Sequence, residues 1–159
     1  MNLDFAHLLG AARGYRELAR AALAGRLEER PIDAEQRAAH GFAWVATSVA
    51  ALEAVLGWLD SNHGGTELDR HVATLAFAET LGQLTGGLPM GQNELFRPAD
   101  LGLGQAARDL AAACAALLDV DQAQARAAVA AALAEGHWPS ESLHDGELDA
   151  IRDQFRRFT

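Results

Sequence analysis

The stretch "AAHGFAWVATSVAALEAVLGWLD", Ala38–Asp60, carries the strongest structural signal in this chain of 159 residues. Its apolar residues recur every three or four positions, which is the spacing of one face of an α-helix. One apolar stripe consists of Phe42, Val45, Val49, Leu52, Leu56 and Leu59. A second stripe beside it consists of Trp44, Ser48, Ala51, Val55 and Trp58. A helix that is apolar on two sides is typical of the centre of a bundle. We therefore expect a central helix from about Ala34 to Asn62, with Asp33 as its N-cap.

Helical patterns continue on both sides of this stretch. The other predicted helices are Asp4–Gly25, Thr66–Thr85, Gln105–Leu118, Asp121–Glu135 and Asp145–Thr159. Alanine, which loses no side-chain entropy in a helix, dominates Ala111–Ala134. The sequence predicts an all-α protein, an antiparallel bundle of about five to six helices. Its central pair should be Asp33–Asn62 and Thr66–Thr85, covered by the first helix and the alanine-rich hairpin.

Composition limits the partners and the compartment. The net charge is −9 and every basic residue is arginine, so nucleic acid and anionic lipid are poor partners. The uncharged run through Ala38 stops at Glu53, short of the ~18 apolar residues of a membrane span. The single cysteine, Cys114, lies in "AAACAALL" and is expected to be a buried core thiol rather than a reactive one. We expect a cytoplasmic protein that binds neither nucleic acid nor membrane.

Catalytic and metal-binding motifs are scarce. The six histidines are spread over five segments, and no His-Glu-x-x-His motif occurs. Glu141–His144 has the Glu-x-x-His spacing of di-metal bundles, but such sites use that motif twice, on facing helices. No nucleophile-elbow, P-loop or dinucleotide-binding motif is present. The sequence therefore predicts no metal site and no catalytic residue in this chain.

One segment interrupts the helical pattern: "GQLTGGLPMGQNELFRP", Gly82–Pro98, with four glycines and two prolines. Its backbone N–H groups could form an anion-binding nest. Alternatively, the glycines end one helix and the prolines begin a turn before the next. The segment contains no lysine and its only arginine is Arg97. We favour a structural corner, and a contact with a ligand stays open.

Part of this segment, "QLTGG" at Gln83–Gly87, resembles the Gln-x-x-Gly-Gly motif of the C-terminal helical domain of acyl-CoA dehydrogenases. In that family the motif lies against the FAD of a neighbouring subunit and leads toward an arginine. The resemblance implies that Gln83, Gly86, Gly87 and Arg97 contact a cofactor. It also implies a bundle similar to that helical domain.

Longer matches extend the resemblance. Ala38–Asp60, "AFAETLGQLTGGLPMGQNELFRPADLG" and "LDAIRDQFRRF" resemble the N-terminal extension of the methylsuccinyl-CoA dehydrogenases, flavoproteins related to the acyl-CoA dehydrogenases. The implied division is a bundle at 1–136, a linker at 137–145, and 146–159 as the start of a helix of a following dehydrogenase core. The family's catalytic glutamate and main flavin site have no counterpart here. The chain alone is therefore expected to be inert and to hold no cofactor, with FAD in the parent enzyme.

Two functions remain open. The resemblance implies a non-catalytic extension domain whose partner is the dehydrogenase core of its own chain, with a homo-oligomer possible. The alternative is a free-standing helical-bundle adaptor that binds a partner protein. Its motivation is the two-sided central helix, which carries Trp44 and Trp58.

Overall fold

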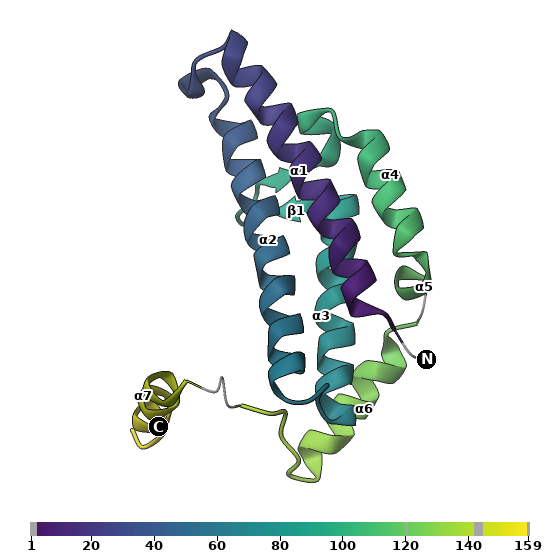
Figure 1. Cartoon of the computed structure of the whole chain (residues 1–159), viewed down its shortest axis with the longest axis vertical. Coiled ribbons are helices and arrows are strands. Elements are labelled where there is room, and N and C mark those ends of the chain that lie inside the picture. Colours follow the sequence, from purple (N-terminus) through teal and green to yellow (C-terminus); the bar gives the residue numbers. More distant parts are fainter. Residues whose placement is uncertain (1–2, 120, 142–144, 159) are drawn as a thin grey trace.

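A computed structural model describes residues 3–119, 121–141 and 145–158 of the chain. The protein is an all-α bundle with one very small antiparallel sheet (Figure 1). The elements are α1 (Phe5–Glu29), η1 (Ile32–Ala34), α2 (Gln36–Ser61), α3 (Glu67–Gly86), β1 (Leu88–Pro89), β2 (Leu95–Phe96), η2 (Pro98–Leu101), α4 (Gly104–Ala113), α5 (Ala115–Leu118), α6 (Ala123–Ala134) and α7 (Gly146–Arg156). The predicted fold class is confirmed, whereas the pairing of β1 with β2 was not expected.

Three long helices form the body of the bundle. Helix α2 packs against α1 on one side and α3 on another, and α3 also contacts α4, α5 and α6 (Figure 1). The predicted contact between the two central helices is therefore confirmed, and α1 covers α2 whereas the alanine-rich helices α4, α5 and α6 cover α3. The largest fully buried side chains are Phe77, Phe96, Leu52, Leu81, Leu84 and Leu117.

The turn between α1 and α2 differs from the prediction. Asp33 lies within the short 3-10 helix η1 and does not cap α2, which begins after Glu35. The Glu35 side chain is only 5% exposed and forms ion pairs with Arg26 and Arg30. These arginines are available because α1 continues about one turn beyond its predicted end, to Glu29. The chain therefore turns around a buried carboxylate that the capping pattern did not reveal.

Only one of the two apolar stripes on α2 is buried. Val45, Val49 and Leu52 are almost completely inaccessible, whereas Trp44 of the second stripe is 37% exposed. The expectation that α2 is covered on both apolar sides is therefore met only in part, because Val55 and Trp58 of the second stripe are half-buried whereas Trp44 is exposed. Among the described helices, α2 is the one that by length and composition alone could cross a membrane. In the bundle its buried stripe faces α1 and α3 instead.

The alanine-rich region also departs from the predicted hairpin. Its first arm is not one helix, because α4 ends at Ala113 and α5 begins at Ala115. Cys114 between them is completely buried, and burial raises the pKa of its thiol to about 11. The predicted core thiol is confirmed, and it stays protonated at neutral pH. The break between the predicted helices Gln105–Leu118 and Asp121–Glu135 falls partly outside the described residues, which omit residue 120.

Truncation of Leu52 tests this core. Leu52→Ala should lower the free energy of unfolding by about 2–5 kcal/mol, because Leu52 is 1% exposed between packed helices. Leu56→Ala, one turn later, should cost less because Leu56 is only partly buried. Urea denaturation gives both values. Equal midpoints for Leu52→Ala and the unmodified protein would refute the assigned core.

Candidate functional site

The Gly82–Pro98 segment forms a packed corner rather than an open loop. Helix α3 ends at Gly86, and Gly87, with φ of +151°, donates its N–H to the Gln83 carbonyl. The chain then forms β1 and β2, paired in the register Leu88–Phe96 and Pro89–Leu95. Leu88, Met90 and Phe96 are buried, and the Met90 N–H donates to the Glu94 carbonyl. The N–H groups of Gly87 and Met90 therefore bind within the corner itself, as expected for its structural role.

A glycine on α2 allows this corner to approach the bundle. A Cβ at Gly41 would lie 2.1 Å from Cδ2 of Phe96. The aromatic ring therefore occupies the volume that any side chain at position 41 would need. The helical pattern of the sequence gives no reason for this glycine, because alanine would be more favourable in the interior of a helix.

Arg37 fixes the corner from the same side of α2. Its guanidinium donates to the Glu94 carboxylate at 3.0 Å, the Leu95 carbonyl at 2.7 Å and the Asp100 carboxylate at 3.4 Å. Asp100 also accepts a hydrogen bond from the Arg97 N–H at 2.8 Å. One side chain of α2 thus connects the hairpin with η2.

The four residues assigned to a cofactor by resemblance are only partly brought together. Gln83 is exposed on the last turn of α3, and Gly87 is half-buried beneath Leu95. Gly86 and Arg97, in contrast, line the same surface groove, which has a volume of about 440 Å³. Arg108 of α4 also lines it, and the sequence interpretation had not selected that residue. The sequence signal that could have identified Arg108 is its position as a basic residue in the alanine-rich segment directly after the corner.

A second polar site lies at the other end of the bundle. Asp69 is completely buried in the first turn of α3, where its carboxylate accepts the Thr66 N–H at 2.8 Å. The same carboxylate accepts the Ser140 N–H and the Ser140 hydroxyl, each at 2.7 Å. The Ser140 carbonyl in turn accepts Nε1–H of Trp58 at 2.9 Å. Ser140 is therefore held by three hydrogen bonds between the ends of α2 and α3.

The ionisation of Asp69 follows from these contacts. Burial alone would raise the pKa of Asp69, but the hydrogen bonds from Thr66 and Ser140 lower it further than burial raises it. The net pKa lies below the ordinary value of 3.8. The carboxylate is consequently charged at neutral pH although it is inaccessible to solvent.

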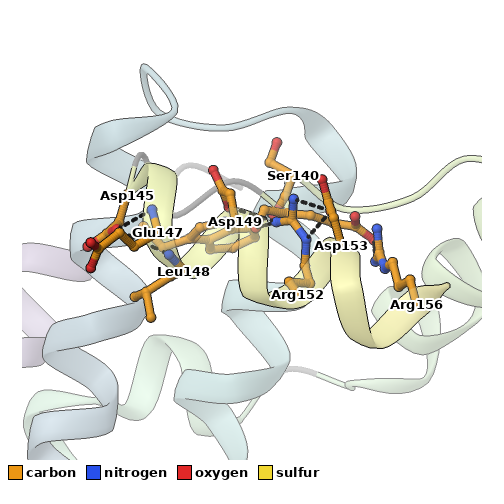
Figure 2. A network of polar contacts seen from close by, with 10 residues as sticks. Ser140, Asp145, Glu147, Leu148, Asp149, Arg152, Asp153 and Arg156 are labelled. Carbon is orange, nitrogen blue, oxygen red and sulfur yellow. Dashed lines mark hydrogen bonds and ion pairs between the residues drawn. The ribbon is translucent and has the colours of Figure 1, made fainter. Parts of the chain in front are cut away.

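Helix α7 follows this anchored residue and carries its own polar network (Figure 2). The Asp145 carboxylate caps the helix by accepting the N–H groups of Glu147 and Leu148. Arg152 donates to Asp149 at 2.9 Å and to the Glu141 carbonyl at 2.6 Å. Arg156 forms an ion pair with Glu141. These contacts connect the polar side of α7 with Glu141.

The apolar side of α7 is uncovered. The exposed fractions are 48% for Leu148, 52% for Ile151, 72% for Phe155 and 87% for Phe158. Figure 1 shows α7 apart from the helical bundle, on the side of α2. The stripe predicted from the sequence is present, and it does not dock on its own bundle.

The described residues outside these two sites offer structural contacts. Glu79 of α3 pairs with Arg126 of α6 at 2.7 Å and so links two helices. Within residues 3–119, 121–141 and 145–158, no group of three or more His, Cys, Asp or Glu residues is placed to hold a metal ion. The Glu-x-x-His segment ends at His144, outside the described residues.

Comparison with known proteins points to one enzyme. No protein-family model matches the chain. The chain is 35% identical over 145 residues to the (2S)-methylsuccinyl-CoA dehydrogenase of Cereibacter sphaeroides, with 84% of this chain and 25% of that protein covered. It is a homologue of one part of an acyl-CoA dehydrogenase. The chain spans about a quarter of the length of this relative, so the likeness concerns one part of that enzyme rather than the whole.

The role of Gly41 can be tested on α2 itself. Gly41→Ala should destabilise the protein by about 1–3 kcal/mol, because the new methyl group must displace the Phe96 ring. Gly57→Ala is the matched control, since a Cβ there meets nothing within 4 Å and should stabilise the helix by about 0.5–1 kcal/mol. Urea denaturation measures both. The same sign for the two substitutions would contradict the assigned contact.

The Asp69 anchor predicts a pH dependence. Because folding lowers the pKa of Asp69, its charged form stabilises the protein above the unfolded-state pKa of 3.8, and this contribution is lost as the pH falls through the lower folded-state value. Asp69→Asn, which removes one accepting oxygen, should cost about 1–3 kcal/mol at pH 7. The difference from the unmodified protein should shrink below about pH 4. Urea denaturation between pH 2.5 and 7 checks this, with the exposed Asp33→Asn as control; a gap independent of pH would contradict it.

Proposed function

We propose that this chain is a non-catalytic helical domain of an FAD-dependent acyl-CoA dehydrogenase similar to methylsuccinyl-CoA dehydrogenase. It corresponds in this proposal to the N-terminal extension of such an enzyme and assembles with the catalytic core. The observation that carries the proposal is the 35% identity to a quarter of the relative. The parent reaction would be oxidation of a short branched dicarboxylic acyl-CoA to its α,β-unsaturated product, with FAD as electron acceptor in the core.

The surface of the chain supports an assembly role. Phe155 and Ile151 on α7 leave most of their apolar area in water, which is unfavourable by about 25 cal/mol for each Å² that a partner could bury. The uncovered side of α2, which carries Trp44, adds apolar and small side chains. Helix α7 lies on the α2 side of the bundle (Figure 1). We propose that the dehydrogenase core contacts this side.

The cofactor contact implied by resemblance stays a prediction. Gly86 and Arg97 line a surface groove that a neighbouring domain could reach, whereas Gly87 is engaged within the corner. In the proposed enzyme the core would hold FAD. Gln83, Gly86, Gly87 and Arg97 would contribute at most an outer contact.

The adaptor function is favoured by a single observation, the exposed Trp44 side of α2, which a partner helix could cover. It differs from the dehydrogenase proposal in requiring no flavoprotein. A domain replacement in the relative separates the two functions.

In that replacement, this chain is substituted for the matched quarter of the Cereibacter sphaeroides enzyme. The chimera should purify with bound flavin and oxidise (2S)-methylsuccinyl-CoA. Ile151→Asp together with Phe155→Asp should lower flavin content and activity by about tenfold or more, because each charge disrupts burial that contributes roughly 1.5–3 kcal/mol. Assays of flavin absorbance and dehydrogenase activity provide the measurement.

Ile32→Asp is the matched control, since Ile32 is 57% exposed on the far turn and should tolerate the charge. A chimera that is colourless while the parent enzyme is yellow would overturn the proposal and favour the adaptor. The proposal would also be overturned if the Ile151→Asp, Phe155→Asp variant kept the same flavin content and activity as the Ile32→Asp control.

A further inference from the structure

A buried tyrosine hydroxyl on α1 has no hydrogen-bond partner among the described residues. Tyr15 belongs to the buried stripe of α1, and its side chain is only 3% exposed. An unpaired buried hydroxyl is unfavourable, because it has given up its hydrogen bonds to water. Phenylalanine would fill the same space without this penalty. The hydroxyl of Tyr15 therefore needs an explanation other than packing.

Tyr15 lines a groove between α1 and α4, two helices that pack against each other (Figure 1). The groove has a volume of about 250 Å³. The apolar or small residues that form the rest of its walls are Ala11, Gly14, Leu18, Ala106, Leu110 and Ala113. The groove thus places an apolar surface beside the ring that carries the unpaired hydroxyl.

The polar groups of the groove favour a neutral ligand. No Arg, Lys or His is among the described residues that line it. Asp109 lines the groove as well, but it is exposed to water and accepts a hydrogen bond from the Gln105 side-chain amide at 2.8 Å. Burial raises the pKa of Tyr15 to about 12, so its hydroxyl is protonated at neutral pH. A protonated hydroxyl can both donate and accept a hydrogen bond.

We propose that this groove binds a small neutral molecule with an apolar body and one hydroxyl or carbonyl group, which pairs with the Tyr15 hydroxyl. An apolar cavity of roughly 150 Å³ holds a benzene molecule, so the larger volume of this groove suits one ring with a polar substituent. Leu18 is 54% exposed in the groove wall, and exposed side chains change rotamer within nanoseconds, which opens a path to the ring. This inference goes beyond the proposed function and does not depend on a dehydrogenase core.

Titration of the 159-residue chain with phenol and with toluene tests the site. The two probes have nearly the same shape, but only phenol carries a hydroxyl. Tyr15 is the only tyrosine of the chain, so a ¹³C-labelled ring gives a single set of NMR signals. Phenol should shift these ring signals and the amide signal of Gly14.

Tyr15→Phe isolates the hydrogen bond, because it keeps the ring and removes the hydroxyl. The ratio of the phenol affinity to the toluene affinity should fall about tenfold in this variant. Taking the ratio cancels the different hydration of the two probes. Without any probe, Tyr15→Phe should raise the urea midpoint, since it removes an unpaired buried group.

Gly14→Leu should fill the groove and abolish phenol binding. Gly10→Leu, about one turn earlier on α1, is the matched control: a Cβ at either glycine meets nothing within 4 Å, but of the two only Gly14 lines the groove. The proposal is overturned if phenol leaves the Tyr15 signals unchanged, if the affinity ratio is the same in Tyr15→Phe, or if the Gly10 control loses as much affinity. A lower urea midpoint for Tyr15→Phe would also overturn it, because a buried water would then already pair with the hydroxyl.

Discussion

The contact between the Phe96 ring and the bare backbone at Gly41 decides how the second half of the molecule meets the first. Interiors of proteins are packed so closely that the ring and a Cβ cannot share one site. Because position 41 lacks a side chain, β1 and β2 lie against α2 and Phe96 is buried. Arg37 then connects the hairpin to η2. The direction of α4, and with it the groove between Arg97 and Arg108, follows from this docking.

At the opposite end, a buried carboxylate has a similar organising effect. Asp69 belongs to the capping box of α3, so its primary role is local. Its remaining hydrogen-bonding capacity is taken by Ser140, far along the chain. A buried charge is stable only when such partners are present. The start of the linker is therefore specified by the polar requirements of a helix terminus rather than by apolar packing.

The sequence predicted the helices well where periodicity is strong and failed where a single contact overrode it. The buried stripe of α2 and the extent of α3, predicted as Thr66–Thr85 and observed as Glu67–Gly86, follow directly from residue spacing. The Asp33 cap was wrong because Glu35, held by two arginines, displaced the start of α2. The second stripe containing Trp44 was identified correctly as apolar, but periodicity does not say whether a partner covers it. In the candidate site, sequence reasoning identified the segment that contains Gly86 and Arg97. It missed Arg108, because α4 comes close to that segment only in the folded structure.

The fixed position of Ser140 has a consequence for whatever α7 binds. Five residues separate Ser140 from Gly146, and an extended chain over this distance reaches about 20 Å at most. Because α7 is tethered, a partner site on or near the bundle would meet it at an effective concentration on the order of millimolar. The contact could therefore form even if the same two surfaces on separate molecules bound each other only weakly. Weak apolar contacts of Ile151 and Phe155 would then suffice for α7 to dock on the partner site. Loosening the Asp69 anchor would lengthen the tether and dilute the helix, although no residue of the interface itself had changed.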